Sequence, residues 1–73
     1  KDDYTMGVPE VADYIGCSVS MVRKLVRTKE IPNYKLGTKL IFRKSVIDWW
    51  ILTKLKEGGF YYEQWKRDVK PWH

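Results

Sequence analysis

The positions of the apolar residues predict two short helices near the start of the chain. In the first segment they lie three or four residues apart, at Val8, Val11, Ala12 and Ile15. This spacing predicts a helix over about 9–15, which Pro9 opens and Gly16 ends. Ser18 is a suitable N-cap for a second helix, whose apolar positions are Val19, Val22, Leu25 and Val26. Two helices joined by a short turn with glycine predict a helix-turn-helix.

The opposite face of the second helix is polar and basic. Its members lie at positions i, i+3, i+4 and i+7, and they are Ser20, Arg23, Lys24 and Arg27. A face that only keeps a helix solvated usually mixes acidic with basic residues, and this face has no acidic residue. The pattern therefore favours contact with nucleic acid over a merely solvated surface.

A change of period after the second helix predicts a β-hairpin. Pro32 interrupts the helical pattern, and residues 34–36 and 40–43 alternate on either side of a turn at Gly37-Thr38. One side is expected to carry Tyr34, Leu36, Leu40 and Phe42, and the other Lys35, Ile41 and Arg43, with Lys39 at or near the tip. The basic side predicts a wing that reaches a phosphate backbone; an edge hairpin kept soluble by lysines is the alternative.

A third helix is predicted after the hairpin. Ser45 and Asp48 resemble a capping box, and the helix is expected to end near Glu57, before Gly58-Gly59. One apolar stripe consists of Ile47, Trp50 and Ile51, and a second of Val46, Trp49 and Thr53. The first stripe suits a core, whereas the second is an exposed apolar patch unless something covers it.

The two ends of the chain differ in character. Residues 1–7 are polar and are expected to be a loose segment in which Tyr4 can anchor on the core. The C-terminal tail, 58–73, holds Phe60, Tyr61, Tyr62, Trp65 and Trp72, and Tyr61, Trp65 and Val69 fit a helical stripe. We predict that this tail folds back on the third helix with Trp65 near Trp49. The alternative is an exposed aromatic patch that meets another protein.

Composition narrows the class of protein. Seventy-three residues suffice for one domain, and 44% hydrophobic with 15% aromatic residues exclude a disordered chain. The single cysteine, Cys17, excludes an intramolecular disulfide and a multi-cysteine zinc site, and we expect a partly buried apolar residue there. The longest apolar stretch, 46–52, is too short to span a bilayer. We expect a cytoplasmic protein, trimmed or excerpted because no initial Met is present.

The residues needed for catalysis are missing from the sequence. The one histidine, His73, is the last residue, and no nucleophile–base set, glycine-rich phosphate loop or metal-spaced cluster occurs. We therefore expect no enzyme, no cofactor and no metal.

Basic charge is concentrated in one third of the chain. Residues 20–44 hold eight basic residues and one acidic residue, a net charge of +7, whereas the remainder carries −2. Such a block is typical of a polyanion-binding face.

These segments together resemble the excisionase-type DNA-binding module, a small winged-helix relative of the MerR activator DNA-binding domains. The resemblance covers about Tyr4 to Ile51, and its motifs are Tyr4-Thr5, VPEVADYIG at 8–16, SVS at 18–20, EIP at 30–32, Gly37, RKS at 43–45 and Trp50. It implies a recognition helix whose start, with Ser18, Ser20, Arg23 and Lys24, faces the major groove. It also implies a wing, with Lys35, Thr38, Lys39 and Arg43, that lies along the minor groove, and core positions at Ile47 and Trp50.

This chain departs from the family pattern in two places. Met6-Gly7 resembles an insertion before the first helix. Ile41, Val46 and Trp49 are apolar where the family tends to have charged or small residues.

We therefore expect an α+β fold, a small winged helix-turn-helix over 8–57. The expected DNA-binding residues are Ser18, Ser20, Met21, Arg23, Lys24 and Arg27 in the recognition helix and Lys35, Thr38, Lys39, Arg43 and Lys44 in the wing. The resemblance implies an excisionase, an architectural protein that binds and bends double-stranded DNA with a tyrosine integrase and neighbouring protomers, and is a monomer off DNA. The alternatives are a small repressor or activator domain, or a protein-interaction module that uses the aromatic tail. RNA binding is disfavoured because a two-stranded hairpin is too small a stacking platform.

Overall fold

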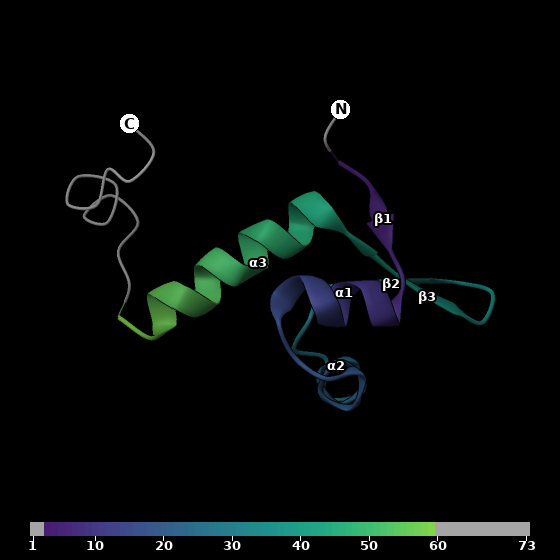
Figure 1. The fold of residues 1–73 in the computed structure, drawn as a ribbon, viewed down its shortest axis with the longest axis horizontal. Coiled ribbons are helices and arrows are strands. Elements are labelled where there is room, and N and C mark those ends of the chain that lie inside the picture. Colours follow the sequence, from purple (N-terminus) through teal and green to yellow (C-terminus); the bar gives the residue numbers. More distant parts are fainter. Residues whose placement is uncertain (1–2, 60–73) are drawn as a thin grey trace.

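The computed structural model of the chain describes residues 3–59, which form three helices and a three-stranded antiparallel sheet (Figure 1). In chain order the elements are β1 (Thr5–Met6), α1 (Val8–Ile15), α2 (Val19–Arg27), β2 (Tyr34–Leu36), β3 (Lys39–Arg43) and α3 (Lys44–Glu57). The strands lie in the order β1-β3-β2. The predicted α+β winged helix-turn-helix is confirmed.

The turn between α1 and α2 forms as the sequence predicts. Gly16 adopts a left-handed conformation, φ 82°, that a side chain would disfavour, and its N–H donates to the Ala12 carbonyl at 3.0 Å. Cys17 is half-buried in this turn. Ser18 then caps α2, because its Oγ accepts a hydrogen bond from the Met21 N–H at 3.1 Å. Residues within the turn thus supply both the end of α1 and the cap of α2.

The core draws on every element except β2. Its buried side chains are Met6, Val8, Val11, Ala12, Val22, Ile31, Phe42 and Ile47. Phe42 and Ile47 are the largest of those that are fully buried, and burying one such side chain contributes about 1.5–3 kcal/mol. Trp50 packs against this core and donates its indole N–H to the Glu30 carbonyl at 2.8 Å, which ties α3 to the loop after α2.

The register of the hairpin differs from the prediction. Leu36 pairs with Lys39, so the turn holds only Gly37, at φ 65°, and Thr38. The predicted arrangement, with Lys39 near the tip, needs a loop one residue longer. One residue of slip turns a strand over, and the faces predicted for β2 were therefore wrong.

The observed faces of the hairpin follow from this register. Residues directly opposite each other in an antiparallel ladder share a face. Tyr34 pairs with Ile41 and lies on the outer face, where it is 42% exposed. Lys35 pairs with Leu40 and lies on the face that also carries the buried Phe42. A lysine was thus predicted outside and is found on the inner face, with its side chain still exposed.

The segment before α1 is more ordered than predicted. Thr5 and Met6 form β1, which pairs with β3, and the Met6 side chain is buried in the core. Tyr4 does not anchor through its side chain, which is 50% exposed; its carbonyl instead accepts a hydrogen bond from the Lys44 N–H at 2.8 Å. The prediction of a loose segment was wrong for these residues, because two residues are too few to show strand alternation.

The predicted capping box of α3 is also wrong. No side chain next to the helix caps it; Asp3, from the start of the chain, does so instead. Its carboxylate accepts hydrogen bonds from the Ser45 N–H at 2.9 Å, the Ser45 hydroxyl at 3.0 Å and the Arg43 guanidinium at 2.9 Å. The bond from the Ser45 N–H is the main cause that lowers the pKa of Asp3 below its usual range.

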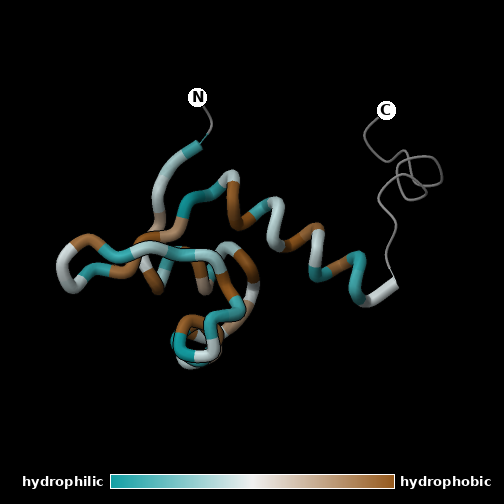
Figure 2. Tube along the Cα trace, turned by 180° about the vertical axis from the view of Figure 1, so that it is seen from behind, coloured by the Kyte–Doolittle hydropathy of each residue, from teal (hydrophilic) through white to brown (hydrophobic). Residues whose placement is uncertain are grey.

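Helix α3 ends at Glu57, as predicted, and Gly59 follows in a left-handed conformation, φ 97°. In Figure 1 the hairpin projects to one side of the α1–α2 pair and α3 to the other. Figure 2 shows apolar and polar residues alternating along the whole of α3. No helix within residues 3–59 is long and apolar enough to cross a membrane. The predicted docking of the aromatic tail concerns residues 60–73, which lie outside the described residues.

Candidate nucleic-acid interface

Helix α2 turns its basic residues away from the core. Val22 is fully buried, and at about 100° per residue Ser20, Lys24 and Arg27 lie nearly opposite it on the helix. All three are exposed. The α2 sequence, VSMVRKLVR, contains no acidic residue, so this outer face presents only hydroxyl and cationic groups to solvent.

The start of α2 adds two further predicted residues. Ser18 uses its hydroxyl oxygen to accept the Met21 N–H, and its hydroxyl hydrogen can still donate to a phosphate oxygen. Met21 is 43% exposed and offers an apolar contact of the kind that packs on a thymine methyl group. Both lie beside Ser20 at the helix N-terminus.

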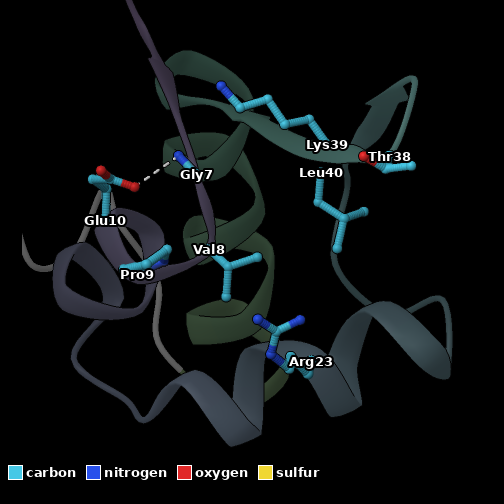
Figure 3. A pocket seen from close by; sticks show the side chains of 8 residues that line it. All are labelled: Gly7, Val8, Pro9, Glu10, Arg23, Thr38, Lys39 and Leu40. Carbon is cyan, nitrogen blue, oxygen red and sulfur yellow. Dashed lines mark hydrogen bonds between the residues drawn. The ribbon is translucent and has the colours of Figure 1, made fainter.

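Arg23 occupies a different position on α2. It lies about 100° from Val22, on the flank that faces the hairpin. There it lines a groove of about 420 Å³ together with Thr38, Lys39 and Leu40 of the hairpin. Figure 3 shows Arg23 pointing up from α2 and Leu40 pointing down from β3 toward it. The structure therefore brings together one residue of the predicted recognition helix and two of the predicted wing.

The other wall of this groove comes from the start of α1, with Gly7, Val8, Pro9 and Glu10. Sequence reasoning missed the place of Glu10 in the groove. Its carboxylate accepts the Gly7 N–H at 3.0 Å, drawn as the dashed line in Figure 3. The spacing of a helix-start glycine and a glutamate three residues later was the available signal.

Lys35 extends the basic surface along the hairpin. Its cross-strand partner Leu40 lines the groove, so Lys35 lies on the groove side of the hairpin rather than on its outer face. The exposed Leu36, 62% accessible, takes the outer face instead.

The last two predicted wing residues lie elsewhere. Arg43 forms an ion pair with Asp3 at 2.9 Å at the start of α3. Lys44 forms one with Asp48 at 2.8 Å, and its ammonium lies 6.0 Å from the centre of the Tyr14 ring. Neither residue lines the groove. Each thus has a carboxylate partner at the junction between the hairpin and α3, and its contact with DNA stays a prediction.

The junction forms a small hydrogen-bonded cluster. Asp48 accepts hydrogen bonds from the Lys44 ammonium and the Tyr14 hydroxyl. The hydrogen bond from Lys44 is the first cause that lowers the pKa of Asp48, and the same contact raises the pKa of Lys44. The hydrogen bond to Asp48 also raises the pKa of Tyr14. The cluster holds α1 against α3 while both helices keep exposed surfaces.

In the described part of the chain, residues 3–59, no three His, Cys, Asp or Glu side chains lie together in a way that could hold a metal ion.

The family of this chain is identified by a match over residues 5–54, which covers 50 of the 73 residues, from β1 through most of α3. The matching family is described as a helix-turn-helix domain and includes excisionase-like DNA-binding proteins. No curated protein and no solved structure matches the chain. The match supports DNA as the partner of the surface described above. The chain belongs to the helix-turn-helix domain family.

Proposed function

We propose that this protein is a sequence-specific double-stranded-DNA-binding protein of the excisionase kind. In this role it binds and bends DNA so that a tyrosine integrase excises a mobile element. It acts by binding and not by catalysis, in the cytoplasm, and is a monomer off DNA. The resemblance of Tyr4 to Ile51 to excisionase-type modules supports this choice among helix-turn-helix proteins.

The observation that carries the proposal is the shared orientation of α2 and the hairpin. The outer face of α2 carries Ser20, Lys24 and Arg27 without an acidic residue, and the groove beside it joins Arg23 to the hairpin residues Thr38 and Lys39. A helix of this size fits the major groove of B-DNA. A basic hairpin at its flank then reaches the neighbouring backbone and minor groove.

Bending separates the excisionase function from that of a simple repressor or activator. We would first select a binding site with the protein from a randomised duplex library. The site would then be moved along a set of equal-length duplexes, and the mobility of each complex would be compared on native gels. The proposal expects mobility to depend on the position of the site, because a bend near the middle retards the complex most.

An excision assay provides the second arm. Where a tyrosine integrase is encoded beside this protein, a plasmid with the attachment sites of that integrase is recombined with and without the protein. The proposal expects excision to rise and integration to fall when the protein is added. A protein that binds its site with position-independent mobility and leaves recombination unchanged would be a transcriptional regulator instead.

A further inference from the structure

The groove between α2 and the hairpin lies where a DNA backbone has to pass. The major and minor grooves of a duplex are separated by a sugar-phosphate backbone. A protein with one element in each groove therefore straddles that backbone. If α2 enters the major groove and the hairpin follows the minor groove, the surface between them faces the phosphates of one strand.

We propose that this groove is a backbone-binding site and that Arg23 is a phosphate contact rather than a base-reading residue. The proposal rests on the DNA-binding function proposed above. It assigns the task of reading bases to the outer face of α2, with Ser20, Lys24 and Arg27, and the task of holding one strand to Arg23 and Lys39.

The position of Arg23 on its helix supports this division. The residues nearly opposite the buried Val22 are those that reach farthest from the core, toward base edges. Arg23 lies instead on the flank, and its guanidinium points into the groove toward Leu40 (Figure 3). From that position it reaches the side of the DNA groove, where the phosphates are, before it reaches the floor, where the base edges are.

The lining of the groove suits a phosphodiester. Arg23 offers a planar guanidinium that can bind two phosphate oxygens at once. Lys39 also lines the groove, but its side chain runs away from Arg23 in Figure 3, so its flexible ammonium is placed to reach a neighbouring phosphate rather than the one that Arg23 binds. Thr38 supplies a hydroxyl donor. Within residues 3–59, neither Arg23 nor Lys39 forms an ion pair, in contrast to Arg43 and Lys44. Their charges are therefore not neutralised by a carboxylate of the described chain.

Apolar side chains also line the groove beside these cations. Val8 is 8% exposed, and Leu40 is partly buried against the core. Arg23 and Lys39 themselves are exposed, so both are accessible to a DNA backbone. Glu10 is the one acidic residue of the lining, and its carboxylate is held by the Gly7 N–H at 3.0 Å.

Methylphosphonate scanning tests the proposal. The probes are a 20-base-pair duplex carrying the site that the wild-type protein selects, a shuffled duplex of equal composition, and versions of the first with one neutral methylphosphonate at each position. Binding by the full chain is measured by fluorescence anisotropy for wild type, Arg23→Ala, Lys39→Ala, Arg27→Ala and Lys56→Ala. Lys56 lies in the last turn of α3, outside the groove, and its variant controls for net charge. Thermal melting confirms that each variant is folded.

Arg23→Ala is expected to weaken binding to the selected and shuffled duplexes by the same factor, about tenfold, whereas Lys56→Ala changes it less than twofold. At one or two adjacent phosphates of one strand, methylphosphonate should weaken wild-type binding but leave Arg23→Ala nearly unaffected. Binding by Lys39→Ala should be nearly unaffected by methylphosphonate at phosphates next to these, where wild-type binding is weakened. Arg27→Ala is expected to weaken binding to the selected duplex more than to the shuffled one.

Three results would overturn the proposal. Loss of affinity for the selected duplex alone in Arg23→Ala would make Arg23 a base reader. Equal methylphosphonate profiles for wild type and Arg23→Ala would show that Arg23 contacts no phosphate. Equal losses of DNA affinity in Arg23→Ala and Lys56→Ala would show that only the net charge of the protein matters. Failure of the proposed function looks different, because the wild-type protein would then select no site and bind neither duplex.

Discussion

The outward face of α2 carries hydroxyl, ammonium and guanidinium groups, whereas the outward face of α3 carries large apolar groups. On α3, Val46, Trp49, Leu52 and Leu55 follow one another at three-residue spacing and are 39%, 63%, 43% and 42% exposed. The opposite side of the same helix buries Ile47 and packs Trp50 against the core. A helix that is apolar on both sides belongs between two layers. The outward face of α2 is therefore suited to contact with solvent or DNA. The outward face of α3 is suited to contact with another apolar surface.

The largest predicted effect is on thermal stability and concerns the segment that we predict to cover the apolar face of α3. Truncation after Gly59 removes the aromatic tail, 60–73, which we predict to pack on α3 with Trp65 near Trp49. Burying one such aromatic residue contributes about 2–3 kcal/mol, so the truncated protein should melt at least about 10 °C lower by circular dichroism.

Trp49→Ala sharpens this prediction. It should destabilise the full chain but leave the melting temperature of the truncated protein almost unchanged, because the covering residue is already gone. A truncated protein that melts like the full chain would show that the tail does not complete the core. The apolar face of α3 would then be the patch that meets an integrase or a neighbouring protomer.

The second effect concerns the α2 face. Arg27→Ala removes a guanidinium from the outermost side of the helix and should cost about 1–3 kcal/mol of binding to the selected site, with a smaller loss on shuffled DNA. Trp49→Ala, on the other face, should leave DNA affinity within about twofold in the anisotropy assay. An equal effect of the two variants on binding would erase the distinction between the faces.

The helices that carry the two faces also differ in how they begin. Helix α2 is capped by its own Ser18, and α3 by Asp3 from 42 residues away in sequence. Because the pKa of Asp3 is lowered in the folded state, its contribution to stability is present above its unfolded pKa of about 3.8 and is lost as the pH falls through the lower folded value.

Asp3→Asn should therefore lower the melting temperature at pH 7 and flatten its fall below about pH 4. Thermal melts of wild type and variant across pH 2–7 measure both effects. Parallel melting curves for the two proteins over that range would contradict the role of the carboxylate at α3.

The smallest predicted effect lies in the turn that joins α1 to α2. Cys17 is half-buried, and its thiol donates only a weak contact to the Ser18 carbonyl at 3.5 Å. Cys17→Ala should leave DNA affinity within about twofold. A tenfold loss in the variant, or a loss in the wild type alone on mild oxidation, would make the turn a redox-sensitive part of the binding face.

The contrast between the two caps explains how much of the fold could be predicted. Gly16 and Ser18 act on neighbours within a few residues, and their conformations and hydrogen bonds follow from local sequence. The pairing of Asp3 with Ser45 depends on β1 lying beside β3, which two strand residues cannot indicate. The prediction of the hairpin faces was wrong for a related reason, since a change of one residue in the length of the loop reverses the face of every residue in β2.

The candidate site shows the same limit. The outer face of α2 could be predicted, because helical spacing places Ser20, Lys24 and Arg27 together. That Arg23 shares a groove with Lys39 and Glu10 depends on how three elements pack, and that Arg43 and Lys44 are paired depends on Asp3 and Asp48. Periodicity along one segment carries no information about contacts between segments.

A salt titration most directly tests whether the basic surface of α2 and the hairpin binds DNA. The five basic residues of α2 and the hairpin that form no ion pair within residues 3–59 suggest roughly 4–5 neutralised phosphates per protomer, so the affinity of the wild-type protein for duplex DNA should fall with a log–log salt slope of about −4 to −5. The measurement is fluorescence anisotropy on a labelled 20-base-pair duplex between 50 and 300 mM salt. A slope in that range supports a basic face of this extent on DNA, and a flat salt dependence would contradict DNA binding by this face.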